Sequence, residues 1–282
     1  MKKLILLAVF LFPFTAIPQP QKGYWQQQAN YTMFIDVDVK KFTYSGEQSL
    51  VYTNNSSDTL QRVFYHLYYN AFKPGSELEA ASRNAHNDKR NMSKNLLSLN
   101  KDDWGDVKVL SLKQDGVLVS HVTKETILEV DLASPLFPGK STTLDMSFFI
   151  KVPAVVRRAG KNNADGVAFS MAQWYPKLCQ YDDQGWHANP YLGREFYGVW
   201  GDFDVTINID KDYTVAASGY LQNPEKIGHG YADLDPSIIH KEKISWHFIA
   251  PDVHDFSWAA DPEYIHDVVP VEGGPVMHFF YK

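Results

Sequence analysis

The stretch YTMFIDVDV, residues 31–39, decides the fold class because its side chains alternate between apolar and polar. A period of two is typical of a β-strand that buries one face and exposes the other. The alternation continues through KFTYSGEQSLVYTN, residues 41–54, and stops at the turn-forming run NNSSD, residues 54–58. These two segments therefore predict two successive strands near the start of the folded chain.

Similar segments recur along the chain, separated by turn signals such as Asp115-Gly116. RVFYHLYYNAF, residues 62–72, is apolar and aromatic on both sides and predicts a strand covered on both faces. Residues 75–103 are polar, and we expect one long insertion there with one or two helical turns. The whole pattern predicts an all-β fold, a β-sandwich or a large pair of twisted sheets. The other strand candidates are DVKVLSL (106–112), TILEVDL (126–132), TTLDMSFFI (142–150), DFDVTINI (202–209), YTVAASG (213–219) and ISWHFIA (244–250).

The N-terminus has the pattern of a secretory signal peptide. Lys2 and Lys3 precede an apolar run, Leu4 to Phe12, that is too short to span a bilayer as a helix. We expect residues 1–20 to be a signal peptide and residues 21–282 one exported domain, periplasmic or secreted; an uncleaved signal anchor is the alternative. Beyond this segment we expect no membrane contact. The chain stops inside a strand-like segment, which suggests that it is cut from a longer protein.

The net charge and the cysteine count each exclude one feature, a nucleic-acid-binding surface and an intrachain disulfide. The formal net charge is -6 and the sequence pI is about 5.9, so there is no basic footprint for nucleic acid. Cys179 is the single cysteine, which excludes an intrachain disulfide. We expect it to be an inert, partly buried thiol.

A search for catalytic motifs finds no complete active site in the sequence. The ten histidines include no H-E-x-x-H pair, and the phosphate-loop, dinucleotide and G-x-S-x-G motifs are absent. The carboxylate pairs Asp182-Asp183 and Asp202/Asp204 lack the spacing of a calcium loop, and we expect them to be solvated surface acids. The sequence therefore predicts no catalytic residue and no metal ligand within this chain.

One long segment resembles the N-terminal β domain of the M1 zinc aminopeptidases, the family of leukotriene hydrolase and aminopeptidase N, in its exported bacterial branch. Its order of motifs carries the resemblance, together with residues 250–264, which resemble the closing strand of that domain. The motifs are Gln173-Trp174-Tyr175-Pro176, Asp182-Asp183, Phe203-Asp204-Val205-Thr206-Ile207 and Ala216-Ala217-Ser218-Gly219.

The resemblance implies a saddle-like all-β domain of twisted sheets, the substrate-orienting domain of an exported zinc metallopeptidase that hydrolyses N-terminal peptide bonds. It implies two partners, a downstream thermolysin-like catalytic domain that binds the zinc and a peptide substrate with a free N-terminus. By position it implies that Gln173 and Tyr175 bind the substrate. Tyr175 departs from the family pattern, because many members have an acid or amide there and a phenol carries no charge at neutral pH.

Other interpretations stay open on the sequence. Gln173 can also be explained as a loop residue that hydrogen-bonds backbone, and Trp174 and Tyr175 can be explained as aromatics packed at a domain boundary. The whole chain could instead be a secreted, non-enzymatic β-sandwich that binds carbohydrate or a cell surface through exposed Trp and Tyr. It could also belong to a peptidase-like scaffold without activity.

Overall fold

A computed structural model describes residues 23–84, 92–154, 158–193 and 197–282. The expected signal peptide, residues 1–20, lies outside these ranges. The largest element is an eight-stranded sheet in the order β16-β17-β14-β1-β2-β8-β4-β5. Its strands are β1 (Gln28–Asp38), β2 (Thr43–Thr53), β4 (Asp106–Gln114), β5 (Val117–Leu118), β8 (Ser141–Lys151), β14 (Gly201–Asp210), β16 (Tyr220–Leu221) and β17 (Lys243–Val253).

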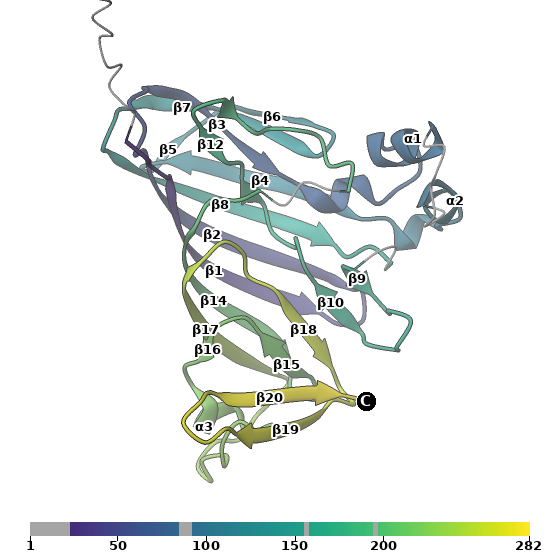
Figure 1. The fold of residues 1–282 in the computed structure, drawn as a ribbon. Coiled ribbons are helices and arrows are strands. Elements are labelled where there is room, and N and C mark those ends of the chain that lie inside the picture. Colours follow the sequence, from purple (N-terminus) through teal and green to yellow (C-terminus); the bar gives the residue numbers. More distant parts are fainter. Residues whose placement is uncertain (1–22, 85–91, 155–157, 194–196) are drawn as a thin grey trace, which may run out of the picture.

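The predicted alternation sets which face of this sheet is buried. Along β1, buried and more exposed side chains alternate, with Tyr31, Met33 and Ile35 all on the inner face. All neighbours in the sheet are antiparallel except β1 and β14, which run parallel with Tyr31 opposite Phe203. Figure 1 shows the large sheet twisting from the upper strands to the lower ones.

Two four-stranded sheets supply the other side of the core, in the orders β11-β3-β7-β6 and β15-β18-β10-β9. Buried side chains of all three sheets form one hydrophobic cluster. The all-β, sandwich-like fold predicted from the sequence is therefore confirmed. The strands are β3 (Leu60–His66), β6 (His121–Lys124), β7 (Ile127–Leu136), β9 (Gly160–Lys161), β10 (Phe169–Met171), β11 (Lys177–Leu178), β15 (Thr214–Ala217) and β18 (Trp258–Asp261). Two separate hairpins are β12 (Tyr181–Asp182) with β13 (Gly185–Trp186), and β19 (Ile265–Pro270) with β20 (Val276–Tyr281).

The helices lie mainly in the predicted insertion. Within residues 75–103 the chain forms α1 (Glu77–Asn84), α2 (Met92–Leu97) and the 3₁₀ turn η2 (Lys101–Asp103). The two helices pack on the core through Leu78 and Leu96 and are more ordered than the polar sequence predicts. Outside the insertion are α3 (Pro224–Ile227) and η1 (Tyr68–Ala71).

The predicted strand over residues 62–72 is wrong in its second half. Strand β3 ends at His66, and Tyr68–Ala71 form the 3₁₀ turn η1. Asn70 explains the change, because its side chain donates to the backbone oxygen of Glu125 at 3.0 Å and accepts from the backbone N–H of Val107 at 2.8 Å. A buried amide that satisfies two backbone groups competes with the ladder hydrogen bonds of a strand.

Candidate functional site

The segment from Gln173 to Leu178 runs from one small sheet to the other across the core. Gln173 follows β10 with φ +57°, in the left-handed region that few residues other than glycine adopt. Lys177 and Leu178 then form β11, which pairs with β3 so that Lys177 lies opposite His66. We call residues 173–178 the crossing segment.

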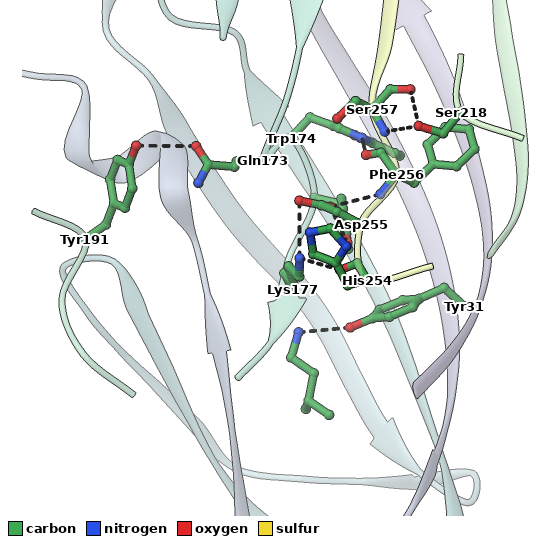
Figure 2. Close-up of polar contacts among 12 residues, drawn as sticks. Tyr31, Gln173, Trp174, Lys177, Tyr191, Ser218, His254, Asp255, Phe256 and Ser257 are labelled. Carbon is green, nitrogen blue, oxygen red and sulfur yellow. Dashed lines mark hydrogen bonds and ion pairs between the residues drawn. The ribbon is translucent and has the colours of Figure 1, made fainter. Parts of the chain in front are cut away.

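The crossing segment is fixed to three consecutive residues of the β17–β18 connection (Figure 2). The indole Nε1 of Trp174 donates to the backbone oxygen of Phe256 at 2.9 Å. The hydroxyl of Tyr175 donates to Oδ1 of Asp255 at 2.9 Å. The ammonium of Lys177 donates to the backbone oxygen of His254 at 2.8 Å and lies 3.2 Å from Oδ2 of Asp255. Residues 254–256 therefore act as one clamp.

The clamp contains a buried ion pair. The side chain of Lys177 is 4% exposed and that of Asp255 is 25% exposed. Burial lowers the pKa of Lys177, and the Asp255 carboxylate opposes that shift. Gly198 covers the pair closely, because a Cβ there would lie 2.7 Å from Cε of Lys177. A buried cation requires such a partner, since unpaired charge in the core is costly.

His66 stands beside this ion pair but stays neutral. Burial, together with the nearby Lys177 charge, lowers the pKa of His66 to about 4. Its Nδ1 is buried without a hydrogen-bond partner, and its ring stacks on Tyr68 with centroids 5.0 Å apart. At neutral pH His66 therefore adds no second positive charge to the clamp.

Gln173 has hydrogen-bonding capacity that the fold does not use. Its side chain accepts a hydrogen bond from the Tyr191 hydroxyl at 3.3 Å, as Figure 2 shows. Its Nε2 is buried and has no partner. Rotating the amide by half a turn would exchange the two atoms, with Nε2 then donating to Tyr191 and Oε1 left to accept. In either orientation one polar atom of this amide remains unpaired.

The two predicted substrate-binding residues, Gln173 and Tyr175, therefore differ in whether the fold already uses their hydrogen-bonding groups. Tyr175 is 1% exposed and its hydroxyl is already bonded to Asp255, and burial raises the pKa of that hydroxyl well above its ordinary value. Trp174 is equally buried and packs on Phe256 and Trp258. The expectation that Trp174 and Tyr175 pack at a domain boundary is wrong, because both lie in the core of this chain.

Cys179, directly after the crossing segment, is fully buried. Burial raises the pKa of its thiol well above the ordinary value. The expected inert thiol is consistent with both facts, because the thiolate is the reactive form.

A groove lies next to the clamp. A hollow of about 580 Å³ and another of about 200 Å³ are both lined by Gln26, Gln180 and Tyr197. The aromatic groove, as we call it, carries exposed rings at Tyr24, Tyr197 and Trp200 and reaches His254 of the clamp.

A hydrogen bond to Asp182 holds the ring of Tyr197 in place. The Tyr197 hydroxyl donates to Oδ2 of Asp182 at 3.1 Å, and His187 Nε2 lies 2.8 Å from the same oxygen. Burial acts to raise the pKa of Asp182, but hydrogen bonds from His187, the Gln184 backbone and Tyr197 outweigh it and lower the pKa. Asp182 is thus a structural acceptor, and the prediction of a solvated surface acid is wrong for it. The sequence pattern did not indicate Tyr197 as part of a groove.

The described residues do not fit a zinc ion. Over residues 23–84, 92–154, 158–193 and 197–282, no group of three or more His, Cys, Asp or Glu side chains could hold a metal. The close pairs, such as His247 with Asp204 at 2.8 Å, each lack a third ligand.

Within the same described ranges, no helix combines the length and the apolar character needed to cross a membrane.

No protein-family profile matches the chain, and no curated protein sequence matches it. Solved structures do match. The M1 zinc metallopeptidase from Deinococcus radiodurans is 13% identical, with 90% of this chain and 46% of that chain covered and a TM-score of 0.47. A variant of it bound to a Tyr-Ser-Ala substrate is 15% identical, with 90% and 46% covered and a TM-score of 0.49. A two-domain M1 zinc metallopeptidase variant bound to L-tryptophan is 13% identical, with 91% and 48% covered and a TM-score of 0.48. The chain spans about half the length of these structures, which belong to the family that the sequence motifs resemble.

Proposed function

We propose that this chain is the substrate-orienting N-terminal part of an exported zinc aminopeptidase. The observation that carries the proposal is Gln173, a buried amide held at a positive φ with one polar atom unpaired. Buried polar atoms are seldom left without a partner unless a ligand or water completes them. With the amide turned so that Nε2 donates to Tyr191, Oε1 can accept from a protonated α-amino group, and this charge-assisted bond discriminates against blocked peptides.

The clamp fixes the position of the backbone beside Gln173. Trp174, Tyr175 and Lys177 are each bonded to residues 254–256, so the backbone after Gln173 has little freedom. A binding group held by its supporting contacts loses less entropy when the ligand arrives. In this proposal Tyr175 acts on the substrate indirectly, by anchoring the crossing segment through Asp255.

The partners follow from the sequence resemblance. A thermolysin-like domain, downstream in a longer protein, binds the zinc that activates water for hydrolysis. The present chain supplies the amine contact, and the substrate is a peptide with a free N-terminus. Export through the signal peptide of residues 1–20 places the enzyme in the periplasm or outside the cell.

The proposal is tested by comparing the 282-residue chain with the same chain extended by its native downstream sequence. We expect bound zinc and chelator-sensitive hydrolysis of amino-acid anilides in the long form only. A long form that binds no zinc and cleaves no substrate would contradict the enzymatic proposal and favour the inactive scaffold.

A second candidate function is carbohydrate binding, which the aromatic groove favours. Exposed rings beside amide side chains suit a sugar, whose flat C–H face stacks on an aromatic ring while its hydroxyls bond to amides. Tyr24 is 87%, Tyr197 56% and Trp200 45% exposed.

The groove is tested by titrating chitotetraose and cellotetraose, followed by NMR. A carbohydrate-binding role predicts saturable shifts that Tyr197→Ala weakens about tenfold, in line with about 1 kcal/mol or more for each stacked ring. Tyr220→Ala, at an exposed tyrosine outside the groove, is the matched control. The absence of saturable shifts would remove this candidate.

A further inference from the structure

A hollow of about 620 Å³ lies between the C-terminal hairpin β19–β20 and the β16 edge of the large sheet. The hairpin and α3 are at the lower end of the molecule in Figure 1. The volume is in the range of small-ligand sites, which are usually apolar clefts with a few polar groups. We call this cavity the hairpin hollow.

Strand β20 forms one wall of the hairpin hollow. Val276, His278 and Phe280 alternate along the strand, so their side chains share one face of the hairpin. The ring of Tyr231 packs beside them, with centroids 5.4 Å from His278 and 5.9 Å from Phe280. The ring planes of His278 and Phe280 are 10° apart. This wall is therefore largely aromatic.

The large sheet forms the opposite wall and the floor. Leu221 of β16 lies opposite Phe248 of β17 in the strand register, and both line the hollow. Phe248 is 1% exposed and therefore belongs to the floor. Tyr220 is 70% exposed and Val276 is 56% exposed, so these two residues mark the side that opens to solvent. A ligand that enters between them reaches a buried ring.

A chain of hydrogen bonds fixes the tautomers of two histidines beside the hollow. His266 Nδ1 lies 3.0 Å from the backbone oxygen of His229, and His266 Nε2 lies 2.8 Å from His278 Nδ1. A backbone oxygen can only accept, so His266 Nδ1 carries a hydrogen. In a neutral His266 ring, Nε2 must then accept from His278 Nδ1. A neutral His278 with its hydrogen on Nδ1 presents Nε2 as an acceptor.

Nε2 of His278 is the polar atom of this wall that the fold leaves unused. Within the described part of the chain, no donor is hydrogen-bonded to it. The hydroxyl of Tyr231, by contrast, already donates to the backbone oxygen of Val215 at 2.9 Å. Burial, and then the nearby His266, lowers the pKa of His278, which favours the neutral ring. The hairpin hollow therefore combines an aromatic wall with a hydrogen-bond acceptor.

We propose that the hairpin hollow binds a flat aromatic ligand that carries an N–H or O–H donor, an indole or a phenol, with the donor on Nε2 of His278. A ring held between Phe280 and Leu221 leaves water and gains offset or edge-to-face contacts with the aromatic wall. A carboxylate is disfavoured there, because it brings acceptors to an acceptor. The site does not depend on the proposed peptidase function, since none of its residues belongs to the clamp or to the amine contact.

The test is an NMR titration of the ¹⁵N-labelled 282-residue chain with indole and with 1-methylindole at about pH 8, above the ordinary histidine pKa of about 6.5. The two probes share the ring system, but 1-methylindole has no N–H. We expect indole to shift the backbone amides of residues 217–221 and 276–280 saturably, with a Kd of about 1 mM. The ring signal of His278 Nε2 should shift with the same Kd. 1-Methylindole should bind about threefold more weakly, because it cannot donate.

Two variants locate the site. His278→Phe keeps a ring in the wall but removes the acceptor, so the preference for indole over 1-methylindole should disappear. Leu221→Trp fills the hollow and should weaken indole binding about tenfold or more. Leu118→Trp is the matched control, because Leu118 is 70% exposed on β5 at the opposite edge of the same sheet. This control should bind indole as the wild type does.

The wild-type titrations alone can refute the proposal, even where a variant fails to fold. Shifts that do not saturate, saturable shifts confined to residues outside the hollow, or equal affinity for the two probes would each overturn it. A His278→Phe variant that folds and still prefers indole would overturn the role of Nε2.

Discussion

Replacing Asp255 by alanine should lower the free energy of unfolding by about 3 kcal/mol, the scale expected when one partner of a buried ion pair is removed. Two consequences combine in this variant. Lys177, 4% exposed, keeps its charge without a counterion, and Tyr175 loses its acceptor. We take the lower end of the expected range because Asp255 is itself 25% exposed. Urea denaturation at neutral pH measures the change.

Two further variants separate the ion pair from a general surface effect. Asp183→Ala removes an exposed carboxylate that lines the aromatic groove, and it should change the stability by about 0.5 kcal/mol or less. Lys177→Met combined with Asp255→Ala removes both charges and should recover part of the loss. An Asp255→Ala variant as stable as Asp183→Ala would show that the clamp does not hold the crossing segment.

Replacing Gln173 by alanine in the extended, zinc-loaded protein should lower kcat/KM for a free peptide about 10- to 100-fold, or about 1.4–2.8 kcal/mol of transition-state binding. The loss follows from removing the amide of Gln173, which has a buried polar atom without a partner in the fold. Alanine is no more strained than glutamine at φ +57°, so the backbone should keep its course.

Gln184→Ala is the matched control, because Gln184 is exposed in the turn between β12 and β13. It should leave kcat/KM within about twofold of the wild type. Equal losses in the two variants would point to a general effect on folding, which thermal unfolding of both proteins would reveal.

Much of the fold could be predicted from the period-two pattern. The segments around Tyr31, Phe203 and Trp246 lie on the strands β1, β14 and β17, with the expected face buried. The pairing could not be predicted, because the parallel contact of β1 with β14 joins residues far apart in the chain. The same limit explains the error at Tyr68–Ala71, where Asn70 bonds to two distant backbone groups.

The site was predictable only in part. Sequence position indicated Gln173 and Tyr175, but not that Tyr175 is buried against Asp255. One signal was available, since Lys177 lies in the apolar run WYPKLC and a cation there needs a buried partner. The sequence could not name that partner, because residues 254–256 reach Lys177 only through the fold.

The most direct test of the central claim is the preference of the extended protein for a free over an N-acetylated peptide, expressed as the ratio of the two kcat/KM values. If Gln173 holds the amine, the ratio should be large in the wild type and in Gln184→Ala and should fall about tenfold or more in Gln173→Ala. A Gln173→Ala variant that is slower on both peptides by the same factor, with the ratio unchanged, would contradict the claim.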